Sequence, residues 1–273
     1  MVMLKSLSAS MNAKISGTGD EIIVLGHGFG ANQYLWEKIV PSLEQKHQVV
    51  LFDWNFSGNF NDKVQSNNSF DAIKYDSLYA FADDLLSLMD EMNIKSCVFV
   101  GHSMSGMIGC IASIKKPQLF KKLILIGASP RYINTEDYEG GFDEAEIKQI
   151  LTTIESNFEQ WVTAFAPIAV GGDPITSEIF ENTIKKMRPE VALAVAKIIF
   201  LGDYRNVLEK VETPCTIINT INDVVAPSFV PHYMQKKMVN AKTRVEFMDV
   251  NGHFPHLTAH DKLLNLLSKV LDS

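Results

Sequence analysis

Cysteine is scarce in this 273-residue chain, which contains only Cys97, Cys110 and Cys215. Their odd number and the lack of any CxxC pair argue against a disulfide framework and against a zinc site. We therefore expect buried, free thiols in a reducing compartment. The sequence also has no GxGxxG, no P-loop and no HExxH. It predicts no organic cofactor and no metal.

Long apolar runs, proline, glycine and positive charge are limited too. No apolar stretch approaches the ~18 residues of a membrane span, and the N-terminus lacks the apolar core of a secretory signal. Ten prolines and sixteen glycines are too few for a fibrous or disordered chain. A net charge of −7 argues against nucleic acid or an anionic membrane as the main partner. The 46% of apolar residues instead predicts a soluble globular protein with a large core.

Short apolar, β-branched runs alternate with segments of helical periodicity along most of the chain. The runs predict strands over 21–26, 48–52, 96–101, 122–127, 214–220 and 244–250. Apolar stripes predict helices over 76–93, 104–116 and 258–271. This alternation predicts an α/β fold with a mostly parallel central sheet and helices on both faces. We expect residues 1–273 to form a single domain.

The region 131–208 breaks the alternation, because it shows helical patterns and no convincing strand. Candidate helices cover 147–157, 158–166, 176–187 and 190–201. Four helices inserted between parallel strands predict a lid over the carboxyl edge of the sheet, where open α/β sheets bind ligands. The lid is rich in aromatic residues, which predict an apolar ligand; they are Tyr132, Phe142, Phe158, Trp161, Phe165, Phe180 and Phe200.

The segment Gly101-His102-Ser103-Met104-Ser105 stands directly between a predicted strand and a predicted helix. GxSxG in that context is typical of a nucleophile elbow, a sharp turn that exposes the serine hydroxyl above the sheet. Ser105 replaces the last glycine, which is a mild departure because serine is also small. We therefore predict Ser103 as the nucleophile and the N–H of Met104 as one donor to an oxyanion.

A serine nucleophile needs a base, and the base needs an orienting acid. His253 follows the last predicted strand, and Asp223 follows the strand before it. The order Ser103, Asp223, His253 is that of an α/β-hydrolase triad. The glycine-rich segment 26–30 follows an early strand, and the N–H of Phe29 is the predicted second oxyanion donor.

Three other carboxylates compete with Asp223 as the orienting acid. Asp249 and Asp203 are weaker candidates, since the first lies within a strand and the second at the end of the lid. Asp53 ends an early strand, where we expect a role in a turn.

Four other histidines compete with His253 as the base. His256 and His260 fall in or near the last helix and are expected at the surface or at a helix cap. We expect His27 to hold the glycine-rich loop by a hydrogen bond, and His102 to pack beneath the elbow.

These motifs resemble the strigolactone and karrikin (butenolide) receptor family of land-plant α/β-hydrolases, which includes the bacterial stress regulator RsbQ. The resemblance covers nearly the whole chain, and SPRY-x-N-x-x-DY-x-GGF is its most specific mark. FSG (56–58) and GHFP (252–255) place the chain in the dwarf-fourteen-like branch. The other segments are GHGFG (26–30), FVGHSMSGMIGCIASIKKPQLF (99–120), SPRYINTEDYEGGF (129–142), APIAVGGD (166–173), MRPEVAL (187–193) and TPCTII (213–218).

The resemblance implies a slow serine hydrolase that cleaves or senses small, apolar, butenolide-type ligands in plant hormone signalling. It implies no metal and no cofactor, and a ring product that can remain covalently attached. An F-box protein and repressor targets are the implied partners of a monomer in the cytoplasm and nucleus. The triad by position is Ser103, Asp223 and His253, and the implied pocket lining is Phe29, Tyr132, Phe142, Phe165, Phe180, Ile199, Phe200 and Val224.

One segment departs from the family pattern. Residues 54–70 (WNFSGNFNDKVQSNNSF) replace an M-G-A-G segment, and their polar composition predicts a mobile loop. This difference leaves ligand identity and F-box recruitment open. Two alternatives also stay open: a general small-molecule carboxylesterase without a receptor role, and a signalling binder with a vestigial triad.

Overall fold

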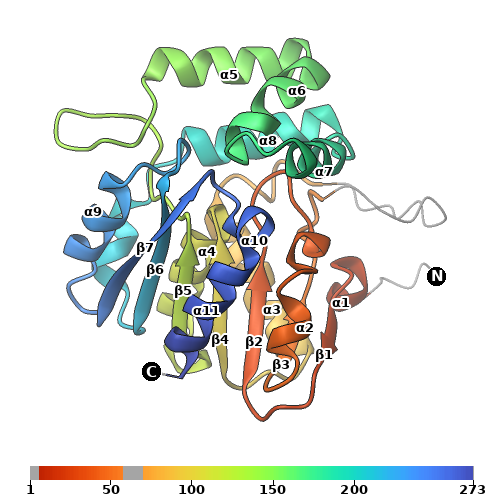
Figure 1. The fold of residues 1–273 in the computed structure, drawn as a ribbon, viewed down its shortest axis with the longest axis vertical. Coiled ribbons are helices and arrows are strands. Elements are labelled where there is room, and N and C mark those ends of the chain that lie inside the picture. Colours follow the sequence, from red (N-terminus) through yellow and green to blue (C-terminus); the bar gives the residue numbers. More distant parts are fainter. Residues whose placement is uncertain (1–5, 58–69, 273) are drawn as a thin grey trace.

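A computed structural model describes residues 6–57 and 70–272, which form a twisted sheet with helices on both of its faces (Figure 1). The strands are hydrogen-bonded in the order β1-β3-β2-β4-β5-β6-β7. β1 runs antiparallel to β3, and the other neighbours are parallel. The α/β fold with a mostly parallel sheet is therefore confirmed. The strands are β1 Lys14–Ser16, β2 Ile22–Gly26, β3 Gln48–Leu51, β4 Cys97–His102, β5 Phe120–Ile126, β6 Cys215–Asn222 and β7 Thr243–Asn251.

The six predicted strands are all present, each within two residues of its predicted ends. The sequence missed β1, which pairs Ile15 with Val50 at one edge of the sheet. β1 has only three residues and little burial, so its sequence is too short to show the alternation of apolar and polar residues that indicates a strand.

Alternate side chains of the central strands face two different apolar clusters. Val24 of β2 packs into the cluster that contains α3 and α4. Its neighbours Ile23 and Leu25 pack into the cluster that contains α2 and α11. A shift of one residue in register would exchange the two faces, so burial on both sides fixes the register. These helices are α2 Val40–Leu43, α3 Leu78–Glu91, α4 Met104–Lys115 and α11 His260–Leu271.

The four predicted lid helices lie between β5 and β6, over the carboxyl ends of the strands (Figure 1). Side-chain caps begin three of them. The Asp143 N–H donates to Glu146 Oε2 at 2.7 Å. Asn157 and Asp173 accept N–H groups of the first turns that follow them. The lid helices are α5 Glu144–Ser156, α6 Phe158–Ala169, α7 Pro174–Ile184 and α8 Pro189–Phe200.

The C-terminal helix predicted over 258–271 is present as α11, which starts two residues later than predicted. A short helix ends at Thr258, and α11 starts at His260. Of the loop predicted over 54–70, residues 58–69 lie outside the described residues. The remaining elements are α1 Leu7–Ser10, η1 Gln33–Trp36, η2 Pro117–Leu119, η3 Arg205–Lys210, α9 Phe229–Lys237 and α10 Pro255–Thr258.

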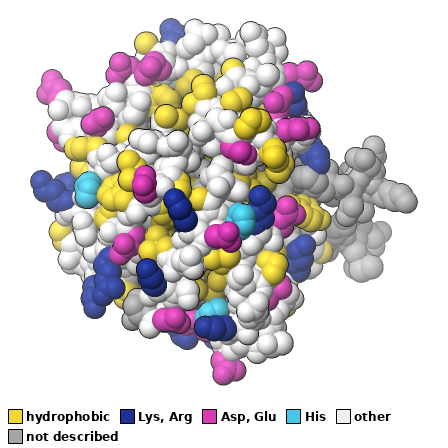
Figure 2. All heavy atoms as spheres, in the orientation of Figure 1, with side chains coloured by type: hydrophobic (Ala, Val, Ile, Leu, Met, Phe, Trp, Pro, Cys, Tyr) yellow, Lys and Arg dark blue, Asp and Glu magenta, His cyan; other side chains and the backbone are white. Residues whose placement is uncertain are grey.

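The surface carries charges of both signs. Figure 2 shows acidic and basic side chains interspersed over one face, with apolar side chains between them. Among the helices described, none is both long enough and apolar enough to cross a membrane.

Candidate active site

Ser103 occupies a strained turn between β4 and α4. Its φ of 56° and ψ of −124° lie in a region that residues other than glycine rarely adopt. The turn is held because the Ser103 N–H donates to the Ile126 carbonyl at 2.8 Å. A Cβ at Gly101 would lie 2.6 Å from the Ser105 carbonyl oxygen, so only glycine fits there. This is the geometry of a nucleophile elbow.

Asp223 and His253 come together as the sequence predicts. Asp223 Oδ2 lies 2.7 Å from His253 Nδ1, and both residues are buried. Asp223 Oδ1 accepts the N–H groups of Val225 at 2.8 Å and Ala226 at 3.0 Å. The carboxylate is therefore fixed by its own turn, and it holds the imidazole in the tautomer that carries a proton on Nδ1.

The other ring nitrogen of His253, Nε2, is not engaged by Asp223. Ser103 and His253 line the same small cavity. His253 Nε2 is buried and has no hydrogen-bond partner among the residues described. It is thus free to accept a proton at the position where a general base is needed.

The lid contacts His253 directly through its backbone. The His253 N–H donates to the Ala169 carbonyl, at the end of α6, at 2.6 Å. Gly252 has a φ of 84°, and a Cβ there would lie 2.5 Å from the Val170 carbonyl carbon. The glycine therefore allows the lid and the histidine loop to meet backbone to backbone.

The glycine-rich loop lies against the elbow. A Cβ at Gly28 would approach Ser103 Cβ to 2.9 Å, so the loop backbone touches the nucleophile's residue. Phe29 lines the cavity, and Met104 is the first residue of α4. The N–H of a first helical residue has no acceptor within its own helix. Both proposed oxyanion donors are therefore beside Ser103.

His27 and Ser105 hold this loop. His27 Nε2 accepts the Trp54 N–H at 3.1 Å, so its Nδ1 carries the proton and donates to the Gly28 carbonyl at 2.9 Å. The expected role of His27 is confirmed. Ser105 Oγ donates to the His27 carbonyl at 2.5 Å and accepts Trp54 Nε1–H at 2.9 Å. The departure from GxSxG thus supplies a hydroxyl that fixes the loop.

We expect Ser105→Ala to lower the free energy of unfolding by about 1 kcal/mol, the contribution of a typical hydrogen bond. The turnover number should fall by up to about tenfold, because the loop that carries the Phe29 N–H loses one of its restraints. Urea unfolding and ester hydrolysis measure the two effects. Unchanged turnover would show that Ser105 does not position the loop. Ser113→Ala, in the same helix but bonded locally to the Cys110 carbonyl, is the matched control.

The cavity above Ser103 has a volume of only about 20 Å³. A volume of this size holds about one water molecule. Apolar and aromatic side chains surround its few polar atoms. Its lining residues are Phe29, Ser103, Tyr132, Phe165, Ile199, Phe200, Val225, His253 and Phe254.

Three of the implied pocket residues do not line this cavity. Val224 is 50% exposed, and its neighbour Val225 faces the cavity instead, because the turn after Asp223 directs successive side chains apart. Phe142 and Phe180 lie in a second layer: Phe142 packs on Phe200, with ring centroids 6.2 Å apart. Phe180 packs on Phe254 at 4.3 Å.

Two lining residues were missed. Phe254 directly follows His253, and this adjacency was the available signal. Val225 could have been identified as a lining residue only if the backbone conformation of its turn had been known.

Two buried, neutral histidines, His102 and His256, lie behind the site. His102 packs beneath the elbow as predicted, and its Nε2 lies 2.8 Å from the His253 carbonyl oxygen. His256 was expected at the surface, but it is fully buried between Trp36 and His102, with ring centroids at 4.5 and 4.7 Å. Burial lowers the pKa of His256 to about 3, and burial lowers the pKa of His102 well below its usual value. Neither ring carries charge near neutral pH.

The competing carboxylates lie elsewhere. Asp249 is exposed on β7. Asp203 pairs with Arg131 at 2.8 Å at the base of the lid. Asp53 Oδ1 accepts the Gln33 N–H at 2.8 Å, which is a structural role in a loop as expected. Asp223 is thus the carboxylate bonded to His253.

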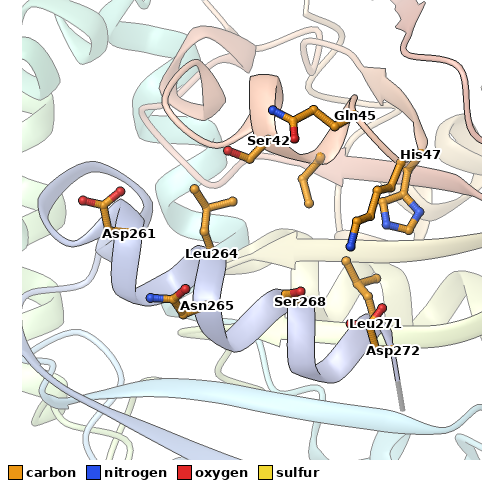
Figure 3. A pocket seen from close by; sticks show the side chains of 11 residues that line it. Ser42, Gln45, His47, Asp261, Leu264, Asn265, Ser268, Leu271 and Asp272 are labelled. Carbon is orange, nitrogen blue, oxygen red and sulfur yellow. The ribbon is translucent and has the colours of Figure 1, made fainter.

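Wider hollows are present among the described residues, but those between described elements contain no such arrangement. The groove in Figure 3, of about 480 Å³, lies between the 42–47 segment and α11 and is lined mainly by exposed polar side chains. In the part of the chain that the structure describes, no group of three or more His, Cys, Asp or Glu residues is placed to hold a metal ion.

Comparison with known proteins agrees with this geometry. The family model of the alpha/beta hydrolase fold matches residues 21–162. The strigolactone esterase D14 of Arabidopsis thaliana is 43% identical over 263 residues, 96% of this chain and 96% of that protein. The karrikin insensitive 2 receptor CA of Petunia hybrida is 39% identical and covers 94% of this chain and 93% of its own. The chain belongs to the family of α/β-hydrolases that contains the strigolactone esterases and the karrikin receptors.

A solved structure extends the likeness to the whole fold. A hydrolase from Oleispira antarctica superposes with a TM-score of 0.91 at 28% identity, covering 98% of this chain and 96% of its own. The family resemblance seen in the motifs is therefore confirmed, and hydrolase chemistry is the activity that the fold and the named esterases support.

Proposed function

We propose that this hydrolase cleaves small butenolide-type esters or enol ethers with a Ser103–His253–Asp223 triad. The observation that carries the proposal is the Asp223–His253 bond at 2.7 Å, whose histidine shares the cavity with an elbow serine. The relatives named strigolactone esterase and karrikin receptor supply the ligand class.

The geometry supports a two-step acyl transfer. Ser103 Oγ attacks the carbonyl carbon, and its proton moves to His253 Nε2. Asp223 stabilises the imidazolium, while the N–H groups of Phe29 and Met104 bind the oxyanion. The proton then passes to the leaving oxygen, and water releases the acyl group from Ser103 by the same sequence in reverse.

The size of the cavity predicts slow turnover. A cavity with space for one water molecule is too small for a lactone ring. Ligand entry therefore requires the side chains of the lid to move. Phe165 and Phe200 form much of that barrier, and they belong to α6 and α8. Ligand binding is thereby coupled to the lid, as a receptor requires. We further propose an F-box protein and repressor targets as partners. We also propose a monomer in the cytoplasm and nucleus. Both proposals rest on the family resemblance alone.

Two classes of substrate, tested separately, distinguish the proposal from its alternatives. Purified protein is incubated with a synthetic strigolactone-type enol ether and, separately, with short acyl esters. We expect slow, saturable release of the butenolide product and a change in Tm on ligand addition. Fast turnover of varied esters without enol-ether cleavage would support the general carboxylesterase instead. A Tm shift without any product would support the binder with a vestigial triad.

A further inference from the structure

The SPRYINTEDYEGGF segment fixes the backbone at Tyr132. The Tyr132 carbonyl accepts the Phe142 N–H at 3.1 Å. The preceding carbonyl, that of Arg131, accepts Ser129 Oγ–H at 2.7 Å and Tyr138 Oη–H at 2.8 Å. The serine and the second tyrosine of the motif thus both hold the Arg131 carbonyl, directly before Tyr132.

Asn134 and the two glycines complete this scaffold. Asn134 Oδ1 accepts the N–H groups of Gly140 at 2.9 Å and Gly141 at 3.0 Å. A Cβ at Gly140 would lie 2.5 Å from the Tyr132 carbonyl oxygen, so the return strand can approach only with glycine there. The motif therefore serves to place one residue, Tyr132, with little freedom.

Tyr132 lines the cavity above Ser103, and its hydroxyl lies close to the Ser103 side chain. The side chain is 3% exposed, and its ring packs edge-on against Phe200 with centroids 5.4 Å apart. Tyr132 Oη is buried without a hydrogen-bond partner in the described part of the chain, as is His253 Nε2. Buried polar atoms are rarely left unbonded, and these two border one cavity with room for a single water.

We propose that Tyr132 is a catalytic residue of deacylation, and that its hydroxyl and His253 Nε2 together bind the water that hydrolyses acyl-Ser103. This rests on the proposed hydrolase function. The water donates one hydrogen to His253 Nε2 and the other to Tyr132 Oη. Its oxygen attacks the acyl carbon as His253 takes the proton. The C–Oγ bond then breaks, His253 returns the proton to Ser103 Oγ, and a carboxylic acid leaves.

Burial keeps the hydroxyl neutral for this role, because it raises the pKa of Tyr132 far above neutral pH. The nearby Ser103 side chain opposes this change in pKa, but the two hydroxyls do not meet hydrogen-bond geometry. Tyr132 therefore orients the water without competing with His253 for its proton.

The test separates the two half-reactions in Tyr132→Phe, which keeps the ring and removes only the hydroxyl. With p-nitrophenyl acetate, the burst of nitrophenol reports acylation, and the decay of the acetyl adduct in intact mass reports deacylation. We expect deacylation to slow about tenfold, the effect of one hydrogen bond, with acylation unchanged. In the steady state, kcat and KM should then fall together while kcat/KM stays constant.

Tyr204→Phe is the matched control, because its hydroxyl is also buried but accepts the Leu78 N–H at 3.1 Å, outside the cavity. We expect wild-type deacylation from it. Wild-type deacylation in Tyr132→Phe, or a fall in kcat/KM alone, would overturn the role of Tyr132 and leave the hydrolase proposal standing. A wild-type protein that forms no Ser103-dependent acyl adduct would overturn both.

Discussion

Ser103→Ala is expected to lower the rate of enol-ether hydrolysis about a thousandfold or more. The variant lacks the proposed nucleophilic oxygen, so no acyl-enzyme can form. Product quantitation by chromatography over several hours measures the residual rate. Ligand-induced changes in Tm should persist, because the substitution removes a single oxygen atom and leaves the apolar residues that line the cavity in place.

Ser113→Ala is the control for this result. Ser113 is equally buried in α4, and its hydroxyl donates to the Cys110 carbonyl at 2.8 Å, away from the site. It should retain close to the wild-type rate. If Ser103→Ala kept more than about a tenth of the activity, another group would have to be the nucleophile.

The protein is expected to lose at least about 2 kcal/mol of stability between pH 7.5 and pH 5. Burial lowers the pKa of His27, His102 and His256 in the folded state, that of His256 to about 3. The unfolded chain therefore binds more protons from about pH 6.5 downward, and the free energy of unfolding falls with pH. His256 alone costs about 2 kcal/mol at pH 5, given its folded pKa of about 3 and an unfolded pKa of about 6.5, and His27 and His102 shift stability in the same direction.

His256→Phe isolates one of these contributions. Phenylalanine can keep the stacking on Trp36, and neither nitrogen of His256 has a hydrogen-bond partner among the described residues. Urea unfolding should show a loss between the two pH values that is smaller by about 2 kcal/mol. His232→Gln, at an exposed site, should leave the loss unchanged. An equal loss in His256→Phe and wild type would contradict the buried, neutral state of this ring.

The residues of the proposed triad could be located from the sequence because each lies at a strand end with a local signature. Ser103 has its elbow, and Asp223 and His253 follow the last two strands. Parallel strands bring their carboxyl ends to one edge of the sheet, so order along the chain was enough to place these residues together.

Other features depend on contacts that no local pattern encodes. Ser105 acquires its role from Trp54, a residue 51 positions away. His256 is buried because α10 packs against Trp36 of η1. The choice of Val225 over Val224 follows from the hydrogen bonds that Asp223 makes within its turn. The small cavity depends on how the rings of α6 and α8 pack above it, which is a property of the assembled lid.

Labelling with a fluorophosphonate tests the central claim most directly, because this probe reacts preferentially with an activated serine. The labelled protein is digested, and its peptides are mapped by mass spectrometry. The account predicts one phosphonylated residue, Ser103, and no labelling in His253→Ala. Labelling of a different residue, or none in the wild-type protein, would contradict a triad of Ser103, His253 and Asp223.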